Sequence, residues 1–208
     1  AAQNTFSLRF RNPGAAMANR DLLYLGVSGD GDTASIGMGQ FAHVIRRNLN
    51  MVYIVMNNGC YGLTQGQDSA TADEGSAGKK GDVNPFHAID LCTTALQMGA
   101  TFVARTIDTE TKHLQEVLLR AAHHRGSAFV EILQNCNIFN DGAFDHVKGR
   151  AVRDERLLFL RHGEPMRYGK DGVRVLTTRP ADGRVQAEAS EAAGDRALVH
   201  DEASTNEG

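Results

Sequence analysis

A short glycine turn, Gly29-Asp30-Gly31, constrains the fold of this chain more than any other feature. The turn follows the apolar run 22–27 and precedes a segment in which apolar residues recur at helical spacing. Glycines between a strand and a helix usually expose backbone N–H groups that hold a phosphate. Because Asp30 and Asp32 place two carboxylates in the same turn, a phosphate alone does not explain the sequence.

Four apolar runs predict the strands of one sheet. The runs 22–27 and 51–56 each read as a strand buried on both faces. With the helix between them they form a strand–helix–strand unit, whose strands are parallel. Further strands are expected at 101–107 and 127–133. The alternation predicts an α/β fold, a mostly parallel sheet with helices on both faces.

Three helices are expected between these strands. Ile36 and Phe41 fall on one face of the first helix. The second helix is expected to be capped by Asn84 and to end at Gly99, and the third to be capped by Asp108 and to run to about His124.

Outside these elements the sequence is less regular. Residues 59–83 carry few apolar anchors, so we expect a long loop, fixed over 60–67 and mobile over 68–81. A small hairpin is expected at 165–176, and 180–208 reads as a loosely held tail.

Two regions are therefore predicted along the chain. Residues 18–150 form the main domain, and residues 151–208 form a C-terminal extension with the hairpin and the tail.

Composition excludes several classes of function. The net charge of −3 gives no basic surface for nucleic acid. No apolar run reaches the roughly 20 residues of a membrane span. Three widely spaced cysteines without a CxxC pair argue against a disulfide framework and against a self-contained zinc site, and they favour the cytoplasm.

Known phosphate and calcium motifs fit the glycine turn poorly. It lacks the Gly-Lys-Ser/Thr of a Walker loop, and position 12 of a calcium loop counted from Asp30 would be Phe41. The dinucleotide fingerprint needs an acidic residue after the next strand, and none lies between Asp32 and Asp68. A nicotinamide dehydrogenase is therefore disfavoured.

A divalent cation explains the carboxylate in the turn. A carboxylate beside a phosphate is repulsive unless a cation lies between them, and Mg²⁺ prefers hard oxygen ligands. The second strand ends at Asn57-Asn58, and neighbouring parallel strands bring their carboxyl ends together. We therefore expect Asp30 and the Asn58 side chain to bind Mg²⁺, with a backbone carbonyl just beyond, while Asp32 faces the helix N-terminus.

The spacing of 28 positions between Asp30 and Asn58 resembles the diphosphate motif of thiamine-diphosphate enzymes. Four segments together resemble the β subunit of 2-oxoacid:ferredoxin oxidoreductases, with the 2-oxoglutarate branch the nearest fit. They are GDGDTASIG at 29–37, RRN at 46–48, NGCYGLTQGQ at 58–67 and EILQNCNIFN at 131–140. The resemblance implies a thiamine-diphosphate-binding fold over 18–150.

Site residues follow from the resemblance by position. It places the Mg²⁺ ligands at Asp30, the Asn58 side chain and the Cys60 carbonyl. The implied cofactor-binding residues are Gly29, Asp30, Gly31, Asp32, Asn58, Cys60, Tyr61, Gly62, Leu63 and Thr64.

Cys136 matches a cysteine that helps to hold a [4Fe-4S] centre in cluster-bearing members of the family. The other three ligands there belong to an N-terminal cysteine segment that has no counterpart in this sequence. We therefore expect an N-terminally truncated copy, in which Cys136 alone cannot hold a cluster.

The implied reaction is the oxidative decarboxylation of a 2-oxoacid, with 2-oxoglutarate as the first candidate, to an acyl-coenzyme A. Electrons pass to ferredoxin, and the glutamate that activates the cofactor lies on a partner α subunit. Two alternatives remain open: a non-oxidative thiamine-diphosphate-dependent decarboxylase or synthase, and an inactive truncated subunit that only completes a complex.

Overall fold

The computed structural model describes residues 14–62, 65–77 and 81–204. The chain divides into two compact units, Ala1–Ala143 and Phe144–Gly208.

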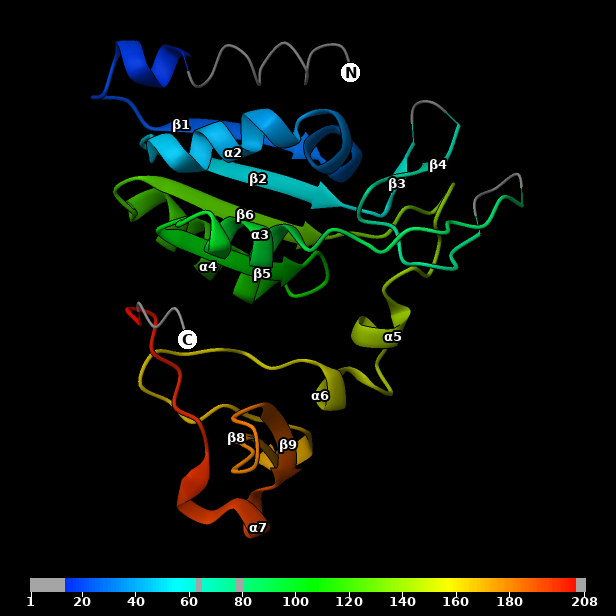
Figure 1. Cartoon of the computed structure of the whole chain (residues 1–208), viewed down its shortest axis with the longest axis vertical. Coiled ribbons are helices and arrows are strands. Elements are labelled where there is room, and N and C mark those ends of the chain that lie inside the picture. The colour runs from blue at the N-terminus through cyan, green and yellow to red at the C-terminus, as the bar shows by residue number, and fades with distance from the viewer. Residues whose placement is uncertain (1–13, 63–64, 78–80, 205–208) are drawn as a thin grey trace. The chain divides into compact units, whose positions relative to one another are not determined.

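A four-stranded sheet forms the centre of the first unit (Figure 1). All its neighbouring strands run parallel, which confirms the predicted fold class. The strands, in the order in which they lie side by side, are β1 (Tyr24–Gly29), β2 (Met51–Asn57), β6 (Ser127–Leu133) and β5 (Phe102–Ile107).

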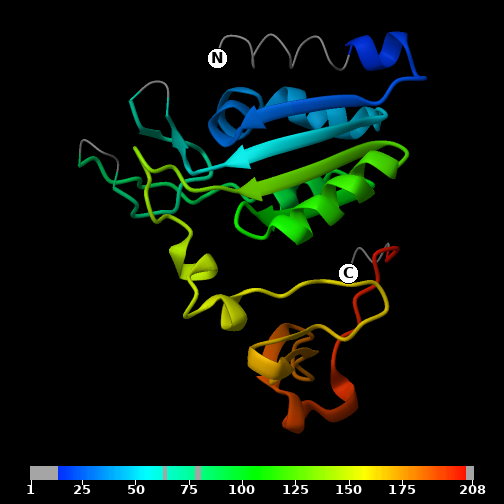
Figure 2. The ribbon, with the colours of Figure 1, turned by 180° about the vertical axis from the view of Figure 1, so that it is seen from behind.

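Helices cover both faces of this sheet (Figures 1 and 2). The π-helical turn η1 and the helices α2 and α3 pack on one face, around the ring of Phe129, and α4 packs on the other face against Val52 and Val130. Their bounds are η1 (Gly31–Ile36), α2 (Met38–Arg47), α3 (Leu91–Gln97) and α4 (Thr111–His123).

The strand β1 differs from its prediction, because only one of its faces is buried. Leu25 and Val27 lie opposite Val52 and Ile54 in the register, so they share the face on which α4 packs. α4 does not extend over β1 (Figure 2), and Leu25 and Val27 are 59% and 43% exposed. The apolar run alone did not reveal which strand the helix would leave uncovered.

The start of α3 was also predicted wrongly. Its N-cap is Asp90, whose side chain accepts a hydrogen bond from the Thr93 N–H at 3.0 Å. Asn84 instead donates to the carbonyl oxygens of Ala72, Asp73 and Phe86. Because those bonds close the preceding loop, Asn84 is not available to start a helix.

Two smaller helix predictions need correction. Glu110, not Asp108, precedes α4, and the Asp108 carboxylate accepts from the Asn135 N–H at 3.2 Å. Ile36 was expected on the buried helix face but is 68% exposed. It ends the π-helical turn, whose wider spacing rotates Ile36 away from the face that holds Phe41.

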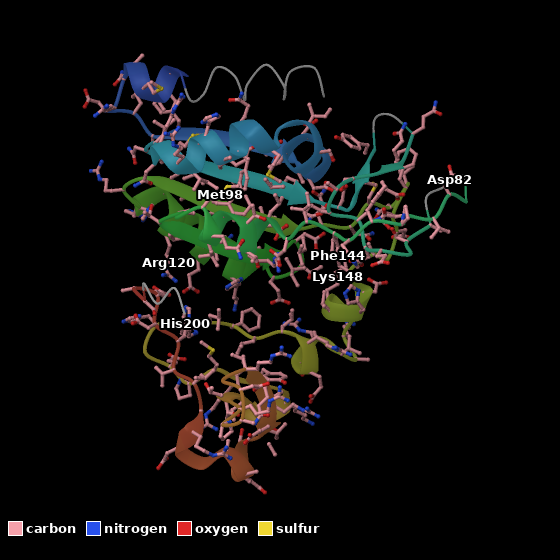
Figure 3. All side chains as sticks on the ribbon, viewed as in Figure 1. Asp82, Met98, Arg120, Phe144, Lys148 and His200 are labelled. Atoms are coloured by element: carbon pink, nitrogen blue, oxygen red, sulfur yellow. The ribbon has the colours of Figure 1, made fainter. Side chains whose placement is uncertain are left out.

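The expected long loop contains a hairpin. Strands β3 (Cys60–Tyr61) and β4 (Gln67–Asp68) pair antiparallel beyond the carboxyl ends of the central strands (Figure 1). Ser69 and Ala72, in the part expected to be mobile, are buried, so that expectation was wrong at these residues. Farther along, Asp82 lies exposed at the outer end of the loop (Figure 3).

The second unit contains a small antiparallel sheet in the order β7-β8-β9. β7 and β8 form the predicted hairpin, and β9 adds a third strand within the segment expected to be a loose tail. Hydrogen bonding to β8 and the burial of Ala193 hold this segment, contrary to that expectation. The elements of the unit are α5 (Asp145–Lys148), α6 (Arg153–Arg156), β7 (Arg167–Tyr168), η2 (Lys170–Gly172), β8 (Arg174–Thr178), β9 (Val185–Ala189), α7 (Ser190–Ala193) and η3 (Gly194–Arg196).

None of the helices in the described ranges combines the length and the apolar character needed to cross a membrane.

Candidate functional site

The side chain of Asp30 lies at the centre of the site and is 1% exposed. Asp30 directly follows β1 and begins η1 with helical backbone angles. Its Oδ1 accepts a hydrogen bond from the backbone N–H of Asn58, just after β2, at 3.3 Å. The parallel pairing of β1 and β2 therefore brings Asp30 and Asn58 together, as the sequence predicts.

Two hydroxyl groups from the following loop bind the other carboxylate oxygen. Ser69 and Thr71 both donate to Asp30 Oδ2, Thr71 at 2.7 Å. Sequence reasoning missed this contact, because loop residues show no periodicity. A buried carboxylate is costly unless donors compensate for its lost hydration, and these hydroxyls supply part of that compensation.

Asn58 is held by its own turn. Its side-chain Oδ1 accepts from the backbone N–H of Cys60 at 3.1 Å, in the pattern of an Asx turn. The Cys60 thiol lies 3.5 Å from the same oxygen, a weak sulfur contact. Because an amide oxygen has two lone pairs, a cation can take the place of the thiol without breaking the turn. One carboxylate and one amide side chain therefore lie at the carboxyl ends of neighbouring strands.

Tyr61 packs directly over the glycine turn. Its hydroxyl donates to the carbonyl oxygen of Gly31 at 2.6 Å. A Cβ added at Gly31 would lie 2.7 Å from the Tyr61 ring, closer than van der Waals contact permits. Gly31 is therefore required by the approach of Tyr61, and the hairpin is fixed to the turn.

A second loop, after β6, closes on the hairpin. Asn140 Nδ2 donates to the backbone oxygen of Asn58 at 2.8 Å. Gly59 and Gly66 both have positive φ, and a Cβ there would meet Asn140 Nδ2 at 2.8 Å and the Phe139 ring at 2.5 Å. The glycines of this motif thus permit the close approach of the loop that contains Cys136.

The thiols of Cys60 and Cys136 are hydrogen-bonded to each other, and their pKa values shift in opposite directions. Burial, and then the hydrogen bond to Cys136, raise the pKa of Cys60 to about 12. Burial tends to raise the pKa of Cys136. The backbone N–H groups of Ile138, Phe139 and Asn140 and the Cys60 thiol outweigh burial and lower this pKa. Cys60 therefore stays protonated, whereas Cys136 has more thiolate character than an ordinary cysteine.

The remaining predicted residues lie around this centre. Gly29 ends β1, Asp32 lies in the first turn of η1, and Gly62 follows β3 beside the Phe139 ring. Leu63 and Thr64 lie outside the described residues.

The donor set fits one hard cation bound to a diphosphate. Asp30 and Asn58 offer oxygen ligands, and the backbone N–H groups at the start of η1 lie where a phosphate would be held. Among residues 14–62, 65–77 and 81–204, no group of three or more His, Cys, Asp or Glu side chains could hold a metal ion. Phosphate oxygens and water would therefore complete the coordination of a Mg²⁺ ion bound here.

The cysteines do not fit a cluster in this chain. The sequence has three, and Cys92 donates to Glu131 rather than joining Cys60 and Cys136. A [4Fe-4S] centre needs four ligands, so these residues alone cannot hold one.

A protein-family comparison agrees with this geometry. The family described as thiamine pyrophosphate enzyme, C-terminal TPP binding domain, matches residues 13–132. These residues include the glycine turn, β2 and almost all of β6.

Among curated relatives, the 2-oxoglutarate oxidoreductase subunit KorB of Mycobacterium tuberculosis is 42% identical over 90% of this chain and 50% of its own length. The 2-oxoacid:ferredoxin oxidoreductase subunit beta of Saccharolobus solfataricus is 39% identical over 62% of this chain and 42% of its own length. The chain thus spans about half the length, or less, of these relatives.

Among solved structures, the 2-oxoglutarate:ferredoxin oxidoreductase from Magnetococcus marinus with 2-oxoglutarate, coenzyme A and succinyl-CoA bound resembles this chain. The TM-score is 0.60 and the identity is 35%, over 64% of this chain and 46% of that chain.

The opposite pKa shifts predict different reactivities for the two thiols. Because the thiolate is the nucleophile, Cys136 should react with iodoacetamide at least about tenfold faster than Cys60 near pH 8. Its rate should level off below the ordinary thiol pKa of about 8.5, while that of Cys60 should still rise above it. Peptide mass spectrometry of timed samples measures both rates.

The same reaction in the urea-unfolded chain is the control, because both thiols should then react at similar rates. Faster labelling of Cys60 than of Cys136 in the folded chain would contradict the description of this thiol pair.

Proposed function

This chain belongs to the thiamine pyrophosphate enzyme family, and we propose that it acts as the β subunit of a 2-oxoacid:ferredoxin oxidoreductase. In this proposal it binds thiamine diphosphate through Mg²⁺. The observation that supports it best is the meeting of Asp30 and Asn58 at the carboxyl ends of two neighbouring parallel strands.

We assign the metal ligands to Asp30, the Asn58 side chain and the carbonyl of Cys60. The backbone of Gly29 and Gly31 would face the diphosphate at the start of η1. The segment from Tyr61 to Thr64 would border the rest of the cofactor. Thiamine diphosphate, when bound, supplies the carbanion chemistry that removes CO₂ from a 2-oxoacid.

The residues of this chain would contribute binding, orientation and charge. Asp30 neutralises part of the metal charge from a buried position, where electrostatic interactions are stronger than in water. Tyr61, through its bond to Gly31, keeps the turn that carries the cofactor in one conformation. Water exclusion would fall to the described loop residues 69–77, of which Ser69 is anchored at the proposed metal position.

We further propose 2-oxoglutarate as the substrate, coenzyme A as the acyl acceptor and ferredoxin as the electron acceptor. The names of the relatives and the ligands bound in the similar solved structure support this choice. The product would be the acyl-coenzyme A. An iron–sulfur cluster would need ligands that the three cysteines of this sequence do not supply.

A separate α subunit would complete the active site. The cofactor-activating glutamate is expected there, and the buried Glu131 of this chain is already engaged by Arg105 and Asn57. The uncovered apolar face of β1, with Leu25 and Val27, is a surface of the kind that subunit interfaces bury.

Replacing Asp30 by alanine removes the only carboxylate among the proposed metal ligands. We expect the affinity for thiamine diphosphate with Mg²⁺ to fall more than about 100-fold, since even residues behind a metal's ligands change affinity about 10- to 100-fold. Calorimetry on the chain assembled with its α subunit measures this. Asp73→Ala, which changes an exposed residue of the loop that follows β4, is the control and should bind the cofactor with wild-type affinity. Unchanged affinity in Asp30→Ala would contradict the metal assignment.

The divided active site predicts that activity depends on both subunits. The chain with its α subunit should reduce a viologen dye when 2-oxoglutarate and coenzyme A are both added, and the chain alone should not. Decarboxylation without dye reduction would indicate a non-oxidative enzyme. Cofactor binding without turnover in the assembled protein would indicate an inactive subunit, and turnover by the chain alone would overturn the divided site.

A further inference from the structure

A buried carboxylate lies beneath the proposed metal site and has no role in the proposed function. Glu131 points from the middle of β6 and is 1% exposed. Its neighbours in this strand are small and apolar, and all of them except Leu133 are buried. A charged side chain in such a strand is rare unless an opposite charge or hydrogen-bond donors compensate for it. The groups that contact Glu131 therefore indicate its role.

Three donors compensate the charge of Glu131. Arg105 Nε donates to Oε2 at 2.6 Å from the neighbouring strand β5, and the Cys92 thiol donates to the same oxygen at 3.4 Å. Asn57 Nδ2, at the end of β2, donates to Oε1 at 2.8 Å. Both carboxylate oxygens of Glu131 thus accept hydrogen bonds, and Oε1 faces β2, the strand that leads to the proposed metal ligands.

The protonation states of the partners agree with this arrangement. Burial opposes the charge of Arg105, but the nearby Glu131 carboxylate raises the pKa of Arg105, so the guanidinium stays charged. Burial, followed by the charge of Glu131, raises the pKa of Cys92, which therefore remains a thiol that can donate. Arg105 also donates to Asp90 at 2.9 Å and so connects the pair to the start of α3.

Glu131 determines which way the Asn57 amide faces. A carboxylate only accepts, so the NH₂ of Asn57 must point toward it and the Asn57 oxygen must point away. That oxygen accepts from the backbone N–H of Gly59 at 3.1 Å. Asn57 thereby fixes the peptide group that joins Asn58 to Gly59, between the two residues proposed to bind the metal, Asn58 and Cys60.

Thr71 connects the same amide oxygen to the proposed metal ligand Asp30. Thr71 Oγ1 is 3.0 Å from Asn57 Oδ1 and 2.7 Å from Asp30 Oδ2, so its single proton serves one acceptor at a time. A continuous series of side-chain contacts therefore runs from Arg105 through Glu131, Asn57 and Thr71 to Asp30. Glu131, Asn57 and Asp30, three members of this series, are buried and shielded from water, whereas Arg105 reaches the surface.

We propose that Glu131, paired with Arg105, is a positioning residue that sets the conformation of the metal-binding loop through the Asn57 amide. This inference rests on the proposed function, since it concerns the same metal and diphosphate site. Glu131 itself does not touch the cofactor or the metal. Side chains that orient metal ligands from behind commonly change metal affinity about 10- to 100-fold when they are replaced.

Mn²⁺ in place of Mg²⁺ makes the metal site visible to electron paramagnetic resonance. The assembled protein with thiamine diphosphate would be titrated with Mn²⁺ as wild type, as Glu131→Gln and as the control Glu116→Gln, which removes an exposed carboxylate from α4. We expect Glu131→Gln to weaken Mn²⁺ binding about 10- to 100-fold. Excess Mn²⁺ should restore the bound signal, and Glu116→Gln should match the wild type.

Hydrogen exchange of the metal-free protein separates positioning from general stability. In Glu131→Gln, exchange should become faster in peptides covering 58–61, while peptides covering 51–56 and 127–133 keep their protection. A purely structural role would raise exchange across the strands as well. Wild-type affinity in a folded Glu131→Gln, or faster exchange throughout the sheet, would overturn the inference.

Arg105→Lys provides a second test that is less disruptive, because Arg105 reaches the surface. It keeps the charge but loses the planar donor geometry, so we expect weaker Mn²⁺ binding and faster exchange over 58–61, both smaller than in Glu131→Gln. Wild-type behaviour of Arg105→Lys would contradict the role given to the pair. Loss of folding in both variants would make the pair purely structural and overturn the inference. Failure of the wild type to bind Mn²⁺ with thiamine diphosphate would instead overturn the proposed function, and with it this inference.

Discussion

The burial of the Asp30 carboxylate is the constraint on which the rest of the site depends. A charge removed from water needs donors or a cation close by. Ser69, Thr71 and the N–H of Asn58 supply three donors, each from a different point of the loops beyond β2. These loops therefore converge on one side chain, and a divalent cation bound there would complete the compensation.

The parallel sheet makes this convergence possible. β1, β2 and β6 are neighbours, so the residues that follow them emerge at one edge of the sheet. Tyr61 and Asn140 then fix the hairpin and the last loop against the turn. Glu131 and Asn57 connect this loop assembly to the interior of the sheet, which ties the position of the proposed ligands to the core.

Much of this arrangement could be predicted from the sequence. The physical basis of those predictions also explains which contacts could not be predicted. The apolar runs at β2 and β6 and the glycine turn indicate the strands, and the approach of Asn58 to Asp30 follows once β1 and β2 are neighbours. The contacts of Ser69 and Thr71 depend on the path of a loop without periodicity. Glu131 and Arg105 carried a signal, since they are opposite charges in two predicted strands, but its interpretation required the pairing of β5 with β6.

The central claim is that Asp30 anchors a metal-bound diphosphate at the edge of the sheet. A crystal structure of the assembled protein with thiamine diphosphate and Mn²⁺, recorded at the manganese absorption edge, tests it most directly. We predict one anomalous peak within about 2.2 Å of both an Asp30 carboxylate oxygen and Asn58 Oδ1, in contact with the diphosphate. A bound diphosphate whose metal lies away from Asp30 would contradict the claim.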